Sequence, residues 1–69
     1  MDRVYKKIEL VGVSAKSFEE AISNAIEKAS KTLHGVAWFE VVEQHGRVVE
    51  GKVTEFQAVI KVAFKLDEK

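Results

Sequence analysis

The clearest pattern of apolar and polar positions lies between Phe18 and Leu33. Apolar residues recur there at intervals of three and four, and charged or polar residues occupy the opposite face. Ser17 followed by Glu20 is a capping-box pattern, in which the two side chains satisfy free backbone N–H groups at the start of a helix. Gly35 suits a left-handed cap at the other end. The pattern therefore predicts one amphipathic helix that begins after Ser17, ends before Gly35 and covers a single surface.

Three other segments alternate between apolar and polar residues in the manner of strands. We expect strands over Arg3–Val11, Val36–Gln44 and Lys52–Leu66, the last of which would span about 50 Å. Glycines near both ends mark His45–Gly51 as a hairpin connection, with room for a bulge or a short strand extension. The order strand, helix, strand, strand predicts a single α+β domain over residues 1–69. In the first strand, one face carries Val4, Lys6, Ile8 and Leu10 and the other carries Tyr5, Lys7, Glu9 and Val11.

One face of the last predicted strand is apolar throughout, and we assign it to the core beneath the helix. Phe39 and Val41 are its natural partners on the middle strand, which places Trp38 on the second face of the sheet. One helix can cover only one face, so Trp38 and Gln57 stay uncovered, and we expect an interface or a ligand platform there. The apolar face comprises Phe56, Ala58, Ile60, Val62, Phe64 and Leu66; the second face also carries Glu40, Val42, Glu55 and Val59.

Composition adds an argument for association. The chain has 69 residues and no Cys, so disulfides cannot stabilise its small core. In a chain this short the gain from hydrophobic burial and the cost in conformational entropy nearly cancel. His34 and His45 are the only imidazoles, and neither has a local cluster of further ligands, so we expect no metal site. Association between copies is the remaining source of stability, and we expect an oligomer.

Charge and hydropathy narrow the range of partners. Eleven basic and eleven acidic residues give zero net charge, which disfavours the phosphate backbone of nucleic acids as a partner. The N-terminus has no apolar signal-peptide region, and no stretch approaches the roughly 20 apolar residues of a membrane span. We therefore expect a soluble, cytoplasmic protein without a membrane or nucleic-acid partner.

Candidate chemistry is confined to binding. The sequence contains no nucleotide-binding loop, metalloprotease motif or nucleophile elbow, and its hydroxyl residues have no evident His and acid beside them, so we expect no enzyme. Trp38 is equally well interpreted as a subunit contact and as a platform for an aromatic ligand. Gln57 on the same face offers an amide suited to a heterocycle edge, and His45 and Arg47 offer donors to an anionic group.

Four stretches of the chain together resemble the dodecins, and the resemblance spans essentially the whole sequence. They are Val4–Ser14, Ala21–Leu33, Val36–Val41 with Trp38, and Phe56–Leu66 with Gln57. The resemblance implies a three-stranded antiparallel sheet partly wrapped around one helix and a hollow dodecamer of such chains. It also implies that flavins are held in pairs at subunit interfaces, stacked between symmetry-related copies of Trp38, with Gln57 at the polar edge of the ring. The implied role is flavin storage, sequestration and photoprotection rather than turnover.

Three further site residues follow from the same resemblance. The turn that contains His45 and Arg47 helps to determine in dodecins whether the ligand tail is a bare ribityl, a phosphate or a dinucleotide. Some bacterial members carry Arg at the position of His45, so phosphate affinity here would be weaker or depend on pH, with Arg47 as a substitute. Lys65 matches a basic position, which implies contact with the ligand tail or with coenzyme A. The expected cofactor is a flavin, FMN first and riboflavin or FAD as alternatives, with coenzyme A as a further ligand.

Two alternatives of other classes stay open. A small βαββ RNA-binding module would also present an aromatic residue on a sheet, but it needs a basic rim, and Glu40 and Glu55 lie on the predicted Trp38 face. A purely structural oligomer would use Trp38 only to seal subunits, and the purified protein would then be colourless.

Overall fold

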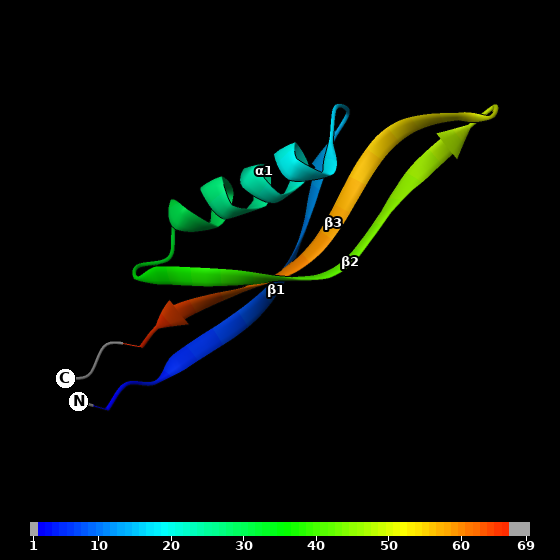
Figure 1. Ribbon diagram of the computed structural model, residues 1–69. Helices are drawn as coiled ribbons and strands as arrows, with labels where there is room; N and C mark the ends of the chain where they lie inside the picture. Colours follow the sequence, from blue (N-terminus) through cyan, green and yellow to red (C-terminus); the bar gives the residue numbers. More distant parts are fainter. Residues whose placement is uncertain (1, 67–69) are drawn as a thin grey trace.

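A computed structural model describes residues 2–66 and contains one helix and three strands. These are β1 (Tyr5–Ser14), α1 (Phe18–Ser30), β2 (Val36–Val49) and β3 (Lys52–Lys65). The strands form one antiparallel sheet in the order β1-β3-β2. Figure 1 shows α1 lying along one side of the bent sheet, with the β2–β3 hairpin extending past it. The predicted β-α-β-β fold is confirmed.

Both ends of α1 can be explained by local hydrogen bonds. The backbone of Ser17 is extended, and its Oγ accepts a hydrogen bond of 3.0 Å from the N–H of Glu20, as the capping pattern predicts. The helix ends at Ser30, earlier than we expected. The N–H groups of Thr32 and Leu33 both donate to the carbonyl of Ala29, which closes the last turn before Gly35 is reached.

The core forms where small residues of α1 meet β1 and β3. Ala21 and Ala25 on α1 are buried against Ile60 and Val62 of β3, whose side chains are fully buried. Gly12 of β1 lies so close to the helix that a Cβ atom there would collide with the carbonyl of Ala21. Small residues on both elements therefore allow the helix to approach the sheet closely.

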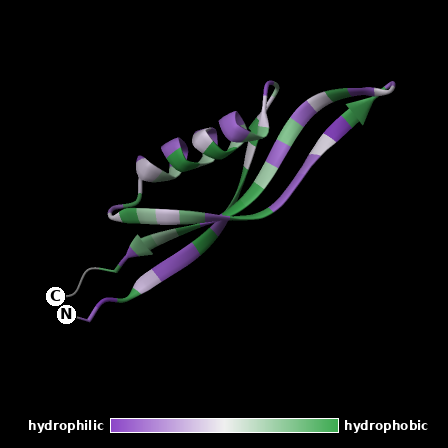
Figure 2. Cartoon of the chain, in the orientation of Figure 1, coloured by the Kyte–Doolittle hydropathy of each residue, from purple (hydrophilic) through white to green (hydrophobic). Residues whose placement is uncertain are grey.

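The pairing register confirms most of the predicted faces. Ile8 and Leu10 of β1 pair with Val62 and Ile60, and Phe39 and Val41 of β2 pair with the same two residues from the other side. Alternating apolar and polar bands along the strands are visible in Figure 2. Phe39 and Val41 remain 44% and 45% exposed, because α1 packs against β1 and β3 and leaves β2 uncovered.

The hairpin contains the strand extension that the prediction allowed, because β2 continues through most of His45–Gly51 and leaves a shorter connection. The connection consists of Glu50 and Gly51, whose φ angles of 51° and 78° are both positive, as in tight hairpin turns. Val41 pairs with Ile60 and Glu43 with Val59, so Val42 is the extra residue of a β-bulge. The alternation of β2 therefore changes at Val42.

The ends of β1 and β3 shift slightly from the prediction. Strand β1 begins at Tyr5 and continues past Val11 to Ser14, because Val13 and Ser14 pair with Gln57 and Phe56.

Within the part of the chain that the structure describes, no helix is both long and apolar enough to cross a membrane.

Candidate functional site

The sheet face opposite α1, which we call the open face, carries the predicted site residues. Its apolar residues include Trp38 and Val11, which are 44% and 57% exposed, whereas Val59 and Ala63 on the central strand are buried by their neighbours. The register gives its members as Tyr5, Lys7, Glu9, Val11 and Val13 from β1; Glu55, Gln57, Val59, Lys61, Ala63 and Lys65 from β3; and Trp38, Glu40, Glu43, His45 and Arg47 from β2.

At one end of the open face, side chains from β1 and β2 meet above β3. The rings of Tyr5 and Trp38 have centroids 4.8 Å apart and are tilted by 55°. Beside them, Lys7 Nζ donates a hydrogen bond of 2.7 Å to Glu40 Oε2. This bond holds the pKa of the Glu40 carboxyl below its usual range, and Trp38 and Lys61 act in the same direction. The end that carries Trp38 is therefore aromatic and has an ionised carboxylate at its edge.

The other end of the open face carries the polar candidates. His45 pairs directly with Gln57, and Arg47 pairs with Glu55. Gln57 Nε2 donates to Glu55 Oε1 at 2.8 Å, and His45 Nδ1 lies 3.1 Å from Glu43 Oε2. The bulge at Val42 brings His45 and Arg47 to this face, since without it the alternation of β2 would turn them toward the helix side. Donors and carboxylates are thus interleaved at this end.

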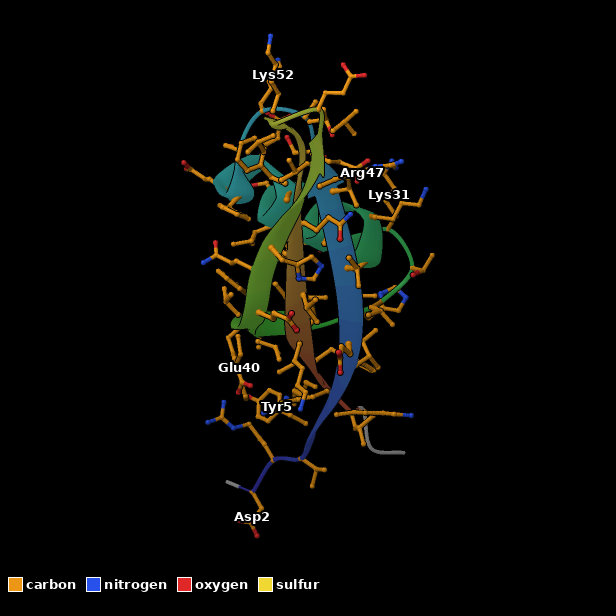
Figure 3. All side chains as sticks on the ribbon, turned by 90° about the vertical axis from the view of Figure 1, so that its right-hand side faces the viewer. Asp2, Tyr5, Lys31, Glu40, Arg47 and Lys52 are labelled. Atoms are coloured by element: carbon orange, nitrogen blue, oxygen red, sulfur yellow. The ribbon has the colours of Figure 1, made fainter. Side chains whose placement is uncertain are left out.

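The structure separates the predicted site residues into two groups. Trp38 pairs with Ala63, and His45 pairs with Gln57, which lies six residues away from Ala63 along β3. Six residues of a strand extend about 20 Å. Lys65 pairs with Tyr5 and so belongs to the Trp38 end. In Figure 3, Tyr5 and Glu40 lie together toward one end of the sheet, and Arg47 lies toward the other. One chain therefore does not bring Trp38 and Gln57 together.

Comparison with known proteins assigns the family. The sequence profile described as Dodecin matches residues 4–67. The chain belongs to the dodecin family. Dodecins are small ligand-binding proteins that assemble as homo-oligomers, and the fold found here is the one predicted for a dodecin. A dodecameric assembly is consistent with the solved dodecin structures that the chain resembles.

Relatives of the chain match it over nearly its whole length. A dodecin of Thermus thermophilus is 48% identical over 68 residues, which cover 99% of each chain. A crystal structure of the tt0972 protein from T. thermophilus superimposes with a TM-score of 0.93 at 47% identity, covering 99% of this chain and 100% of the other. The calcium dodecin of Mycobacterium tuberculosis is 33% identical over 64 residues, covering 91% of this chain and 89% of that protein.

The calcium in that last name raises the question of a metal site. Within residues 2–66, no three His, Asp or Glu side chains gather as a set of metal ligands. On the open face, Glu40 contacts Lys7 and Glu55 contacts Gln57 of the same chain.

Two features of the open face were not predicted from the sequence. The contact of Tyr5 with Trp38 and the ion pair of Lys7 with Glu40 both join β1 to β2. Alternation places Tyr5 and Lys7 together on one face of the first strand, but it does not say which strand lies beside which. The order β1-β3-β2 supplies that information.

Proposed function

We propose that this chain binds flavins and holds them in store, sequestered and protected from light, at interfaces between identical subunits. The isoalloxazine ring would stack on Trp38, and Gln57 would hydrogen-bond its polar edge. The observation that carries the proposal is the half-exposed Trp38 on a face that α1 does not cover, in a chain that belongs to the dodecin family. A flat, exposed indole offers a stacking surface that needs no rearrangement of the strand.

The distance between Trp38 and Gln57 supports a site shared by two copies. About 20 Å of strand separates the two residues in one chain, which is longer than a tricyclic ring. A twofold axis that packs two open faces with their strands antiparallel brings the Trp38 end of one copy to the Gln57 end of the next. Such a site is incomplete in a monomer, and repetition of the contact in a closed assembly of twelve would give each copy the same surroundings.

The ligand tail is the part that the polar residues would recognise. His45 and Arg47 lie at the Gln57 end and present donors suited to a phosphate. We therefore propose FMN as the first ligand, before riboflavin or FAD. Glu43 and Glu55 contact two residues of this end and would limit its affinity for larger anions. Lys65 lies at the Trp38 end, and we propose it as a contact for the ligand tail or for coenzyme A.

Titration of flavin fluorescence tests the proposal directly. We expect the wild-type protein to quench FMN and riboflavin, because an indole stacked on the ring drains its excited state. Trp38→Ala should weaken binding by about 1–3 kcal/mol, the value of a stacking contact on an aromatic side chain. Gln57→Ala should cost roughly 1 kcal/mol, the value of one neutral hydrogen bond. Tighter binding of FMN than of riboflavin would show that the protein recognises the phosphate.

Phe39→Ala is the matched control for Trp38→Ala. Phe39 is the next residue of β2 and is equally exposed, at 44%, but it lies on the helix side. Phe39→Ala should therefore leave flavin quenching unchanged. Wild-type protein that is colourless after purification and leaves flavin fluorescence unchanged would refute the proposal and favour a purely structural oligomer. A cytoplasmic location and the lack of a nucleic-acid partner stay predictions.

A further inference from the structure

The Tyr5–Trp38 contact bridges two strands that are not neighbours. Tyr5 is on β1 and Trp38 on β2, and β3 lies between them. Ala63 of β3 pairs with Trp38 and is fully buried, and its small side chain leaves the space above β3 to the two rings. The ring centroids are 4.8 Å apart at a tilt of 55°, which lies within the range of favourable aromatic pairs.

Charged groups on both sides of this pair limit its freedom. The guanidinium carbon of Arg3 lies 5.9 Å from the centroid of the Tyr5 ring, within the range of a cation–π interaction. Lys7 and Glu40 form a second bridge between β1 and β2, with a 2.7 Å hydrogen bond. Tyr5 is therefore held from the Arg3 side while it contacts the indole.

We propose that Tyr5 is a positioning residue for Trp38 and that it fixes the indole in the orientation from which it stacks on a ligand ring. Trp38 is half-exposed on an outer strand of the sheet, where an isolated side chain would populate several rotamers. Contact with Tyr5 restricts those rotamers before the ligand arrives, so binding loses less side-chain entropy. The proposal rests on the proposed function, because its ligand is the same flavin.

The test compares Tyr5→Ala with Tyr5→Phe. Tyr5→Ala removes the ring and should weaken FMN binding by about 2- to 10-fold, as the energies of aromatic pairs imply. Tyr5→Phe keeps the ring and should bind within about twofold of wild type. In a double-mutant cycle, Tyr5→Ala should have no further effect once Trp38 is replaced by Ala, because Tyr5 acts through the indole.

A readout without flavin separates this proposal from the proposed function. The chain has one Trp, so emission excited at wavelengths beyond the tyrosine absorption, and circular dichroism at those same wavelengths, report on Trp38 alone. Tyr5→Ala should lower the emission anisotropy and weaken the dichroism, and Tyr5→Phe should preserve both. If Tyr5→Ala reduces the native mass, Tyr5→Leu, which keeps apolar volume without a ring, replaces it.

Two results would overturn the positioning role. One is unchanged anisotropy and dichroism in Tyr5→Ala. The other is additivity: if the losses of FMN affinity in Tyr5→Ala and Trp38→Ala add up in the double mutant, Tyr5 acts independently of Trp38. Wild-type protein that does not bind FMN would instead refute the proposed function, and the ligand-free measurements would still decide whether Tyr5 fixes the indole.

Discussion

Trp38 and Phe39 follow one another in β2 and are equally exposed, at 44% each, yet they lie on opposite faces of the sheet. Phe39 pairs with Val62 on the side of the helix, and Trp38 pairs with Ala63 on the open face. Exposure alone therefore does not distinguish a ligand platform from a core residue that the helix fails to cover. The neighbours of the two residues differ, because Trp38 is flanked by Tyr5 and by an ionised Glu40.

The Lys7–Glu40 pair gives a prediction about pH at the level of single residues. The folded-state pKa of Glu40 lies below its ordinary value of 4.5, chiefly because Lys7 donates a hydrogen bond to it. The stability that this pair contributes is therefore complete above pH 4.5 and is lost as the pH falls through the lowered pKa. Glu40→Gln should lower the thermal midpoint slightly at neutral pH and not at all in strong acid, where the wild-type carboxyl is protonated as well.

Thermal melts of wild type, Glu40→Gln and Glu9→Gln across the acid range check this prediction. Glu9 is the matched position, because it lies on β1 on the same face and pairs with Lys61. A constant difference between wild type and Glu40→Gln at all pH values would contradict the assigned role. The effect should be small at neutral pH, since both side chains of the pair are more than 40% exposed.

Among the secondary-structure elements, close packing of α1 and the β-bulge at Val42 shape the candidate site. Helix α1 presents Ala21, Ala25 and Ala29 to the sheet, so it can lie near the backbone of β1. The bulge at Val42 changes the alternation within β2, so Trp38 and His45 share a face although one has an even number and the other an odd one. The helix therefore covers one face of the sheet, and the bulge places Trp38 and His45 together on the other.

Gly12→Ala tests the packing of the helix on β1. The added Cβ would collide with the backbone carbonyl of Ala21, which cannot rotate away as a side chain would. We expect a loss of about 1–3 kcal/mol in the free energy of unfolding, measured by urea denaturation. Gly51→Asn is the control, because Asn tolerates the positive φ of 78° and nothing lies within 4 Å of its Cβ position. Equal stability of the two variants would contradict the close approach of α1.

At the scale of the whole molecule, the chain is elongated rather than round. Its principal extents are 54 × 20 × 13 Å, and the open face runs along the sheet without a covering helix. A single chain therefore has one covered and one uncovered face. Because the dodecin family forms homo-oligomers, we expect a second copy of the chain to cover this face. The thermal midpoint should then increase with protein concentration.

Val11→Glu tests the role of the open face in assembly. Val11 is 57% exposed on this face, and a buried carboxylate at a subunit interface would be costly. The variant should show a lower native mass and a lower thermal midpoint, whereas Ser23→Glu on the exposed side of α1 should change neither. An unchanged native mass in Val11→Glu would show that the subunits contact one another elsewhere.

The amino-acid pattern specifies the number and order of the elements, the start of the helix and most residues of each face. These features depend on local periodicity and on capping, which act between residues close in the chain. It also singled out Trp38, Gln57, His45, Arg47 and Lys65 as candidates. It predicted a hairpin connection within His45–Gly51 with room for a strand extension, but it did not locate the turn at Glu50 and Gly51 or the bulge at Val42, because both depend on the pairing register.

The grouping of the candidate residues depends on how the strands pair. The strand order β1-β3-β2 brings Tyr5 to Trp38 and Lys7 to Glu40, and the register separates Trp38 from Gln57 by about 20 Å. Both depend on pairing between segments far apart in the chain, whose energies are not written in any local pattern. For this reason the sequence could name candidate residues, whereas the fold decides that Trp38 and Gln57 lie too far apart in one chain for a single ring to contact both.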